Sequence, residues 1–479
     1  MTAPIRVLHL SAEVVPFSKT GGLADVAGAL PPEQRGLEGY QRIDARVLTP
    51  LYGFIDPARW GLKVKSAERY IRLGGQIFKA RLWADAEDHT WFIDCPGLLD
   101  RPTPYGAPGQ PPYADNPLRF AVMCKVAADL ADDFDVVHLH DWHAGLAAAY
   151  LQGKVPTIQT IHNMAYLGLC DPAWADRLEI PQHLRGWQGM EFHGQLSMLK
   201  AGLVCADMIT TVSPRYAQEI QGEPGGQGLS GLLAHRGAAV RGILNGIDEV
   251  AWDPANDAAL AAPYSLEAPE GRATCRETLL KMMSFSPDPQ LQRPIMGVVA
   301  RGTYQKGFDL LVDAAPTLVA QGVRLVVLTA GEPSLVERVR GLAVEHPDAV
   351  ALYVGFDDGL ARRIYAGSDC VLVPSRFEPC GLTQLIGMRY GSVPIVRATG
   401  GLADTVEHGV TGFTFDDATP EALLSATDAA VKHFGDRTAW RAMQARCMAQ
   451  DWSWAGPVRS YHGLYSELLS APSGVKRSV

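Results

Sequence analysis

The feature that most constrains the fold of this chain is an alternation of short apolar runs with helical patterns. In the first half the apolar runs are Ile5–Leu10, Arg46–Thr49, Trp91–Asp94, Val136–His140, Thr157–Ile161 and Met208–Val212. The second half repeats the alternation with the runs Pro294–Ala300, Arg324–Thr329, Ala351–Val354, Cys370–Pro374 and Val393–Arg397. Strands that alternate with helices form βαβ units on mostly parallel sheets. The sequence therefore predicts an α/β protein with two Rossmann-like halves.

The length of the chain agrees with two large domains. At about 150 residues per domain, 479 residues exceed what a single core holds. Between residues 244 and 264 the chain carries Asn-Gly, Asp-Pro and Ala-Pro pairs, which are typical of a connection and not of a core element. We expect an N-terminal domain over residues 1–246, a C-terminal domain over residues 247–451 and a hinge near residues 246–262.

Composition and charge exclude several classes of function. Apolar residues make up 47% and charged residues 20%, as in ordinary globular proteins. The net charge of -9 argues against a surface that coats nucleic acid. No run of 18 apolar residues is present, so no membrane span is expected. Eight scattered cysteines without a paired spacing, and the lack of an export signal, lead us to expect a cytoplasmic protein with reduced thiols.

Residues Lys19–Asp25 (KTGGLAD) form the first candidate site. The sequence matches neither GxGxxG nor GxxxxGK[ST], but it sets a cation beside two flexible glycine amides at a helix start, an arrangement that suits a phosphate or diphosphate. The hexapeptide of Thr20–Asp25 recurs at Thr399–Asp404, and we expect the paired glycines to have the same role in both places. The structural alternative is a tight turn between a strand and a helix.

The second candidate is the cluster His138, His140 and His143, in the sequence HLHDWH. Residues i and i+2 share one face of a strand, so His138 and His140 project together, while His143 starts the following helix. An HxHxxH cluster can hold zinc, which makes a metal-dependent hydrolase an alternative function. The other interpretation is a polar floor at the carboxyl end of the strand, where open α/β sheets bind ligands. His162, at the end of the next strand, can likewise be a polar group of such a floor, and the structural alternative is a capping or core histidine.

Two loops in the second half of the chain contain the remaining candidate site residues. Arg301 and Lys306 lie five residues apart directly after a strand, so they can close on the two phosphates of a leaving group. In the other loop Glu378 precedes Gly381, which opens a helix whose first amides are available for an anion. A carboxylate in that position can accept hydrogen bonds from sugar hydroxyls. Phosphate-binding helix starts and hydroxyl-binding groups at strand ends together favour a nucleotide-sugar ligand, and hence a glycosyltransferase.

These motifs, in this order, resemble those of bacterial glycogen synthases and plant starch synthases, which are retaining glucosyltransferases of the two-domain GT-B type. The resemblance covers nearly the whole chain. It depends on KTGGLADV at 19–26, HDWHAGL at 140–146, TIHN at 160–163, LKAG at 199–202, TTVSPRYAQEI at 210–220, LNGID at 244–248, QKGFDLL at 305–311, SRFEPCGLTQL at 375–385 and TGGLADTV at 399–406.

The resemblance implies a fold and an activity. It implies two Rossmann-like domains facing a central cleft (the GT-B fold), with a C-terminal helix at residues 452–479 packing back on the first domain. It also implies that glucose passes from ADP-glucose to the non-reducing end of an α-1,4-glucan such as glycogen, with retention of configuration, and that no metal or other cofactor takes part. Another GT-B enzyme with a different acceptor stays open as an alternative.

The resemblance also implies roles for single residues. Arg301, Lys306 and Glu378 match catalytic positions, and His162 matches a histidine that reaches the glucose. The implied donor-binding residues are Lys19, Gly21, Gly22, Asp25, Asn245, Phe356, Cys380, Gly381, Leu382 and Thr383. The implied acceptor-side residues are Asp141, His143 and Asn163.

The chain departs from the family pattern in four places. Phe356 stands where the family usually has a tyrosine stacked on adenine, which keeps the stacking surface and loses a hydroxyl. Residues 31–40 contain two prolines and two glycines where a smooth helix and a short turn are usual. Residues 300–302 (Ala-Arg-Gly) replace Ser-Arg-Leu, and residues 329–332 (Thr-Ala-Gly-Glu) replace a loop richer in glycine. The last two changes border the expected donor site.

Overall fold

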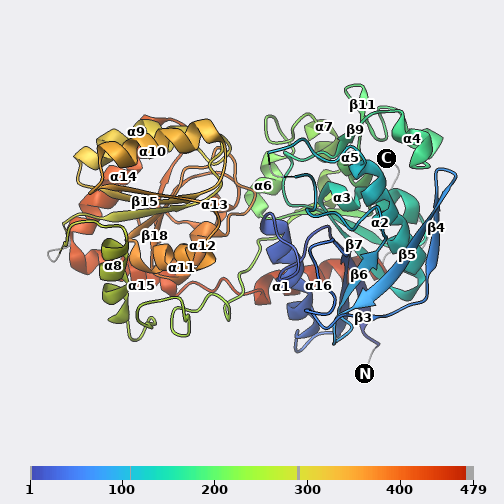
Figure 1. Cartoon of the computed structure of the whole chain (residues 1–479), viewed down its shortest axis with the longest axis horizontal. Coiled ribbons are helices and arrows are strands. Elements are labelled where there is room, and N and C mark those ends of the chain that lie inside the picture. The colour runs from blue at the N-terminus through green and yellow to red at the C-terminus, as the bar shows by residue number, and fades with distance from the viewer. Residues whose placement is uncertain (1–2, 108, 289–291, 471–479) are drawn as a thin grey trace. The chain divides into compact units, whose positions relative to one another are not determined.

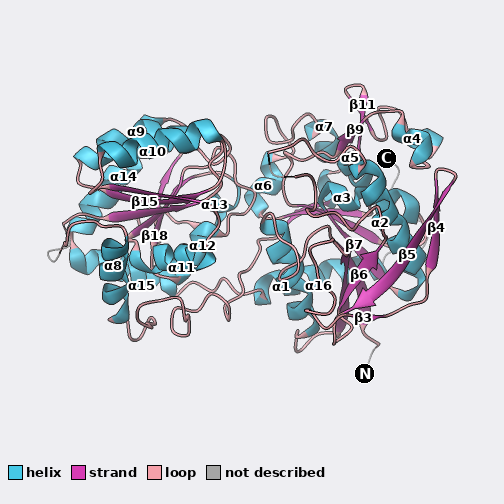
Figure 2. Cartoon of the chain, in the orientation of Figure 1, coloured by secondary structure: helices cyan, strands magenta, loops and turns pink. Residues whose placement is uncertain are grey.

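The computed structural model describes residues 3–107, 109–288 and 292–470 of the chain. These residues form two compact units (Figure 1). The first comprises Met1–Asn245 and Trp454–Val479, as far as those residues are described, and the second comprises Gly246–Ser453. Figure 2 shows that both units are built from strands surrounded by helices, as the alternation in the sequence predicts. The protein is therefore a mixed α/β protein.

The first unit is built on a large, mainly parallel sheet. Its parallel strands are β1 (Ile5–Leu10), β2 (Ile43–Pro50), β6 (Thr90–Asp94), β7 (Val136–His140), β8 (Thr157–Ile161), β12 (Met208–Thr211) and β13 (Val240–Gly242). They lie in the order β13-β12-β8-β7-β1-β2-β6. The order reverses between β1 and β7, which makes that pair the topological switch point of a Rossmann-like sheet.

The strands of this sheet were predictable because both faces are covered. All five residues of β7 and all five of β8 are buried, and five of the six residues of β1 are buried. Parallel strands buried on both faces appear in sequence as nearly continuous apolar runs. Each run that the sequence analysis predicted as a strand is a strand in the structure, with ends that differ by at most three residues.

An antiparallel extension of the same sheet was not predicted. It consists of β3 (Lys63–Val64), β4 (Arg69–Leu73) and β5 (Gln76–Ala84), and β5 pairs with β6. In β5 exposed or half-buried residues precede and alternate with buried ones, so the segment has no continuous apolar run. A separate small sheet contains β9 (Leu169–Cys170), β10 (Glu191–Phe192) and β11 (Gln195–Ser197).

Helices cover both faces of the first sheet. They are α1 (Gly22–Arg35), α2 (Asn116–Leu130), α3 (Asp141–Leu151), α4 (Trp174–Arg177), α5 (Met198–Cys205), α6 (Pro214–Glu219), α7 (Ser230–His235) and the C-terminal α16 (Ala455–Ser470). Helix α1 continues through Pro31 and Pro32, and Gln34 near its end is fully buried. Tyr461 and Tyr465 of α16 join one core with Ile5 of β1. The last described helix is thus part of the unit that begins the chain.

The second unit has a six-stranded parallel sheet. Its strands are β14 (Ile295–Val299), β15 (Arg324–Thr329), β16 (Val350–Val354), β17 (Cys370–Val373), β18 (Val393–Arg397) and β19 (Phe413–Phe415). Their order is β16-β15-β14-β17-β18-β19, which is the strand order 3-2-1-4-5-6 of the Rossmann fold. The switch point of this sheet therefore lies between β14 and β17.

The helices of the second unit also cover both faces of its sheet. They are α8 (Gly271–Met282), α9 (Phe308–Ala320), α10 (Pro333–Glu345), α11 (Asp358–Gly367), α12 (Thr383–Arg389), α13 (Gly400–Thr405), α14 (Pro420–Gly435) and α15 (Arg437–Met448). Figure 1 shows α9, α10 and α14 on one side of the sheet and α8, α11 and α12 on the other.

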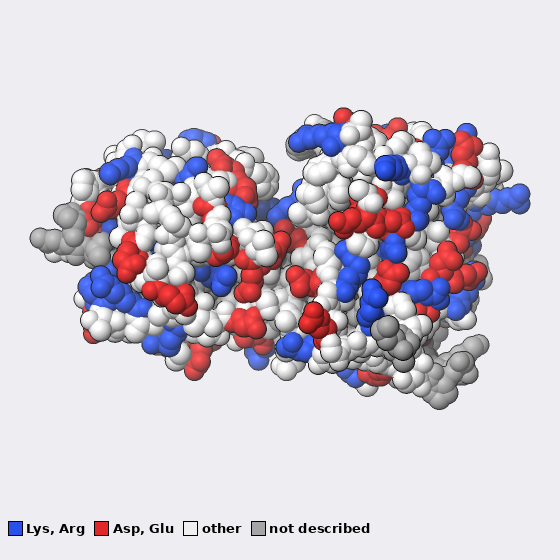
Figure 3. Space-filling model, turned by 90° about the horizontal axis from the view of Figure 1, so that it is seen from below, with Lys and Arg blue, Asp and Glu red and all other residues white. Residues whose placement is uncertain are grey.

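The surface carries charges of both signs. On the face shown in Figure 3, acidic and basic side chains are interspersed over both units. None of the helices in the described residues combines the length and the apolar character that a bilayer crossing needs.

Close contact between two helices of the first unit gives a test of this packing. A Cβ atom at Gly145 of α3 would lie 2.1 Å from the carbonyl oxygen of Met198 at the start of α5. We predict that Gly145→Ala lowers the free energy of unfolding by about 1–3 kcal/mol, because backbone atoms cannot move aside cheaply. Gly231→Ala in α7 is the matched control, since a Cβ atom there meets no described atom within 4 Å. Chemical denaturation followed by circular dichroism measures both; equal midpoints would contradict the packing described.

Candidate functional site

The predicted site residues all follow the carboxyl ends of parallel strands. Lys19 to Asp25 follow β1, Asp141 and His143 follow β7, and His162 and Asn163 follow β8. In the second unit Arg301 and Lys306 follow β14, and Glu378 to Thr383 follow β17. These strands include both switch points, where open α/β sheets bind ligands. The described residues thus contain two polar edges, one in each unit.

The central contact of the second edge is an ion pair between Lys306 and Glu378. Lys306 Nζ lies 2.5 Å from Glu378 Oε2, and the hydroxyl of Ser375 donates to the same oxygen at 2.9 Å. The side chain of Glu378 is 9% exposed and that of Lys306 20% exposed. A partly desolvated, hydrogen-bonded pair of this kind has a defined geometry, unlike a pair on the open surface. Both charged partners were predicted from the sequence, whereas Ser375 was part of the quoted SRFEPCGLTQL motif but had no predicted role.

Glycine allows the Lys306 loop to lie against β17. Gly307 has φ +67°, and a Cβ atom there would lie 2.0 Å from the carbonyl oxygen of Pro374. The backbone N–H of Arg376 donates to the carbonyl of Gln305 at 2.8 Å, and the Arg376 guanidinium lies 4.0 Å from the ring centre of Tyr304. A larger residue at 307 would push Lys306 away from Glu378.

Two of the departures from the family pattern meet in space. Gly302 forms a bridge with Gly331, and a Cβ atom at Gly331 would lie 2.3 Å from the carbonyl oxygen of Gly302. The N–H of Gly302 donates to Ala330 at 3.1 Å, and the N–H of Glu332 donates to Gly302 at 2.8 Å. The loops at 300–302 and 329–332 are therefore one paired feature beside Arg301, and neither can change alone without breaking this contact.

The remaining donor-side predictions fall in different environments. Phe356 follows β16 and is 85% exposed, so its ring is available for stacking. Cys380 is buried, and Gly381 has φ +74° just before α12. Leu382 and Thr383 are half-buried at the start of that helix.

The second copy of the repeated hexapeptide packs closely against backbone. A Cβ atom at Gly400 would lie 2.0 Å from the carbonyl oxygen of Glu378, and one at Gly401 would lie 2.1 Å from that of Cys380. The N–H of Gly401 already donates to Glu378 at 3.1 Å. These glycines permit close packing of α13 against the backbone that holds Glu378, which agrees with the structural alternative of a tight turn for this copy.

The first copy is open. Cβ atoms at Gly21 and Gly22 would meet no described atom within 4 Å, and Lys19 Nζ forms an exposed ion pair with Asp25 at 2.7 Å. An exposed pair contributes about 0–1 kcal/mol, so Lys19 can exchange Asp25 for a ligand phosphate at little cost.

A buried glutamate that the sequence analysis missed holds this loop. Glu13 is 2% exposed, accepts a hydrogen bond from the hydroxyl of Thr20 at 2.6 Å, and also accepts from the N–H of Thr20 and the hydroxyl of Tyr105. Its place three residues beyond an apolar strand was a visible signal. Tyr105 gave none, because it belongs to a loop with no motif.

At the edge of the first unit, Asp141 connects β7 and β8. Asp141 is the first residue of α3, has φ +56°, and its Oδ1 accepts a hydrogen bond from the N–H of His162 at 2.7 Å. Burial raises the pKa of the Asp141 carboxyl to about 7. Burial also lowers the pKa of His162 to about 3, so the imidazole of His162 is neutral at physiological pH. The expected acceptor-side carboxylate and the expected catalytic histidine are therefore in direct contact.

The other predictions for the first unit are less closely grouped. His143 stacks on Tyr105 with ring centres 4.8 Å apart, and its buried Nδ1 lacks a partner among the described residues. Asn163 uses its side chain to accept from the N–H of Ala165 at 2.9 Å, which forms a local turn. Asn245 is 6% exposed, and its Oδ1 is likewise buried without a partner in the described part of the chain.

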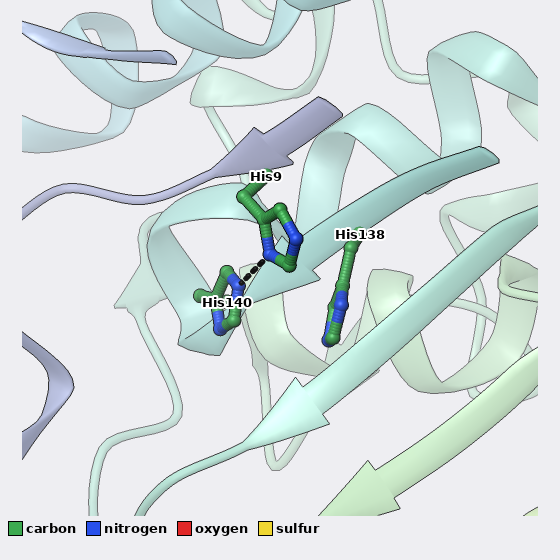
Figure 4. A group of neighbouring side chains, drawn as sticks. All are labelled: His9, His138 and His140. Carbon is green, nitrogen blue, oxygen red and sulfur yellow. Dashed lines mark hydrogen bonds between the residues drawn. The ribbon is translucent and has the colours of Figure 1, made fainter. Parts of the chain in front are cut away.

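The histidine cluster differs from the predicted one. The group with metal-ligand spacing within the described ranges is His9, His138 and His140, shown in Figure 4, with His143 outside it. Every ring nitrogen of the three is hydrogen-bonded to a neighbouring side chain. The alternative of a zinc site at His138, His140 and His143 does not fit these contacts, since His143 packs among aromatic rings and the ring nitrogens of His138 and His140 bond neighbouring side chains. The polar-floor interpretation fits these contacts.

Comparison with known proteins agrees with this architecture. Residues 6–235 match the family model described as starch synthase catalytic domain, and residues 283–442 match that of glycosyl transferases group 1. Glycogen synthases of Leptothrix cholodnii and Edwardsiella ictaluri are 41% and 42% identical, covering 97% of this chain and 100% of each relative. The catalytic domain of starch synthase IV from Arabidopsis thaliana, bound to ADP and acarbose, has a TM-score of 0.89 and 28% identity, over 98% of this chain and 100% of that one.

Two Rossmann-like units with polar carboxyl edges, and these matches, define a glycosyltransferase with the GT-B fold. More narrowly, the chain belongs to the glycogen synthase and starch synthase family.

The buried carboxyl of Asp141 gives a pH-dependent prediction. Folded Asp141 keeps its proton up to about pH 7, whereas an unfolded aspartate releases it near pH 3.8. Unfolding therefore releases a proton between these values, and the free energy of unfolding falls as pH rises. We predict that Asp141→Asn gains stability over the native chain by up to about 1.4 kcal/mol for each pH unit in this window.

Asp135, just before β7, is the matched control with the opposite sign. Its hydrogen bond with Arg6 holds the pKa of the Asp135 carboxyl below its ordinary value. The ionised Asp135 carboxyl stabilises the folded protein at pH values above the pKa of an unfolded aspartate. This stabilisation is lost as the pH falls through the lower pKa that Asp135 has in the folded protein. Asp135→Asn should therefore be destabilised at pH 7 and resemble the native chain in acid. Urea titrations at several pH values measure both; parallel profiles for the two variants would refute the assignment.

Proposed function

We propose that this chain transfers glucose from ADP-glucose to the non-reducing end of an α-1,4-glucan such as glycogen, with retention of configuration. The observation that supports this most directly is the Lys306–Glu378 pair at the switch point of the second unit, held by Ser375 and the Gly307 turn. Two relatives that align with nearly the whole of this chain are named glycogen synthases. The Arabidopsis relative is bound to ADP and acarbose, which supports the same substrates.

Lys306 resolves an electrostatic conflict in the proposed site. A carboxylate that binds sugar hydroxyls and a diphosphate carry the same sign of charge, so they repel each other when they bind the same donor. An ammonium group has three donors, and Lys306 can keep Glu378 while it donates to a phosphate oxygen. Arg301, on the same loop, adds a second cation for the charge that develops on the leaving group.

The reaction balances without an added group. The bond between C1 of glucose and the phosphate oxygen breaks, and the acceptor's 4-hydroxyl oxygen bonds to C1 on the same face. The acceptor proton passes to the leaving phosphate, which gives ADP and a glucan longer by one unit. Two cations and the amides at helix starts stabilise the diphosphate, so we propose that no metal or cofactor is required.

The proposal also assigns roles to the other residues that the sequence predicted. His162 would contact the transferred glucose. The proposed donor-binding residues are Lys19, Gly21, Gly22, Asp25, Asn245, Phe356, Cys380, Gly381, Leu382 and Thr383. The proposed acceptor-side residues are Asp141, His143 and Asn163.

The eight cysteines are all unpaired, which supports a reducing, cytoplasmic environment.

The proposal predicts the behaviour of variants of the ion pair. Native protein should release ADP from ADP-glucose in a glycogen-dependent manner, and release should continue in EDTA. Glu378→Ala and Lys306→Ala should each lower kcat at least about 100-fold, because each removes charge complementarity at the reacting centre. A coupled assay for ADP measures all of these rates.

Lys281→Ala provides the control, since Lys281 is an exposed lysine of α8 in the same unit and should retain native activity. Absence of glycogen-dependent release from either ADP-glucose or UDP-glucose would refute the proposal and favour a GT-B enzyme with another acceptor. Loss of activity in EDTA would refute the metal-independent mechanism.

Phe356 gives a separate prediction about the donor. If its exposed ring stacks on adenine, Phe356→Ala should raise the KM for ADP-glucose about tenfold and leave kcat within about twofold, because stacking of a base contributes about 1–3 kcal/mol. Tyr353, an aromatic residue that is 49% exposed on the adjoining strand β16, is the matched control. Equal KM values for Phe356→Ala and Tyr353→Ala would show that Phe356 does not bind the donor.

A further inference from the structure

The buried histidines belong to a longer chain of hydrogen bonds within the first unit. Seven hydrogen bonds, none longer than 3.1 Å, join eight buried side chains end to end. In order, the members are Thr210, Thr160, His138, Tyr465, Gln34, His9, His140 and His162. We call this set the histidine wire. Figure 4 shows three of its rings and the bond between His9 and His140.

The imidazoles of the wire are neutral. Burial lowers the pKa of His9 to about 4 and of His162 to about 3, and it holds the pKa values of His138 and His140 well below the ordinary range. A neutral imidazole has one N–H donor and one acceptor nitrogen. Since each internal histidine uses both nitrogens, the direction of one hydrogen bond determines the direction of the next.

Gln34 determines this direction. Its Oε1 lies 2.8 Å from His9 Nε2, and an amide oxygen can only accept, so His9 carries its proton on Nε2. His9 Nδ1 then accepts from His140 Nε2 at 3.1 Å, and His140 Nδ1 accepts from His162 Nε2 at 2.9 Å. His162 is therefore protonated on Nε2, and its Nδ1 is an acceptor.

Tyr465 bonds the other end of Gln34. The other end of the Gln34 amide, Nε2, donates to the hydroxyl of Tyr465 at 2.9 Å, and that hydroxyl lies 2.9 Å from His138 Nδ1. Reversing the amide would require the tyrosine hydroxyl to donate to Gln34, and every proton from His138 to His162 would have to change its nitrogen. The hydroxyl of Tyr465 on α16 thus belongs to the same ordered run of hydrogen bonds as His162.

We propose that Tyr465 and Gln34 are positioning residues that hold His162 in its Nε2-protonated form, so that His162 Nδ1 accepts a hydrogen bond from a sugar hydroxyl of the bound substrate. The hydrogen bond between His162 and a sugar hydroxyl rests on the proposed function. Hydroxyl groups can donate to such a nitrogen, whereas the opposite tautomer would offer them a donor. The wire therefore determines whether His162 offers the substrate an acceptor or a donor. Its member Tyr465 lies on α16, which follows the entire second unit in sequence.

The tautomer itself can be measured without substrate. In native protein labelled with ¹⁵N-histidine, a long-range ¹H–¹⁵N correlation spectrum at pH 7 should show His162 with a protonated Nε2 and an unprotonated Nδ1. The His162→Gln variant identifies the resonances. A His162 protonated on Nδ1, or an even mixture of the two forms, would overturn the proposal.

Two variants test the positioning role. Tyr465→Phe removes the acceptor of the Gln34 amide, and Gln34→Met breaks the wire at the same point. Both should convert His162 to a mixture of tautomers and lower kcat about two- to tenfold, in proportion to the fraction in the wrong form. Tyr461→Phe is the matched control, because Tyr461 lies one turn earlier on α16, with its ring centre 5.2 Å from that of His138, and is not a member of the wire.

The outcomes separate the inference from the proposed function. An unchanged His162 spectrum in folded Tyr465→Phe and Gln34→Met would overturn the wire, and a changed spectrum with native kcat would overturn its positioning role. A fall in kcat of the same size in Tyr461→Phe would indicate a merely structural effect of α16. If native protein shows the predicted tautomer but no glycogen-dependent ADP release, the proposed function fails while the control of His162 by Tyr465 stands.

Discussion

The parallel direction of the strands is the constraint on which the rest of this structure depends. In a parallel sheet every carboxyl end lies at one edge, so the loops that follow the strands meet there whatever their separation in sequence. Both units use the same strand order around β1 and β14, and in both several of the predicted polar residues follow the strands that flank the reversal. Lys306 and Glu378, 72 residues apart, meet for this reason.

Close approach of backbones turns this shared edge into a defined site. Gly307 brings its loop against Pro374, and Gly400 and Gly401 bring α13 against the segment that holds Glu378. The same hexapeptide at the start of α1 leaves Gly21 unobstructed. Glycine thus has two uses in one repeated sequence: one copy lets the protein pack on itself, and the other leaves room beside a cation.

The parts of the fold that could be predicted are those in which burial controls composition. Continuous apolar runs such as Val136–His140 identify strands covered on both faces, and their alternation with helices gave the two-unit architecture. Strand β5 was missed because its exposed and half-buried residues interrupt the apolar pattern. In the candidate site, loops after strands were predictable from motifs. The ion pair of Lys306 was not, since nothing in the sequence measures the distance between two loops.

Contacts over long separations were the least predictable. Glu13 is a lone carboxylate in a loop, and only folding brings Thr20 and Tyr105 to it. The grouping of the histidines was missed for the same reason: the sequence shows that His138 and His140 share a face, but not that His9 joins them in place of His143. Spacing along a chain identifies candidate groups, whereas their hydrogen bonds decide which chemistry remains available to them.

The return of α16 to the first unit has a consequence for the order in which the molecule can be completed. Tyr461, Tyr465 and Trp454 belong to the same core as Ile5 and Val7, yet the entire second unit lies between them in the chain. A ribosome synthesises that second unit before it delivers α16. The second unit is continuous in sequence and can fold as soon as it emerges, while one face of the first sheet waits uncovered. The first unit, whose synthesis begins first, is therefore the last to complete its core.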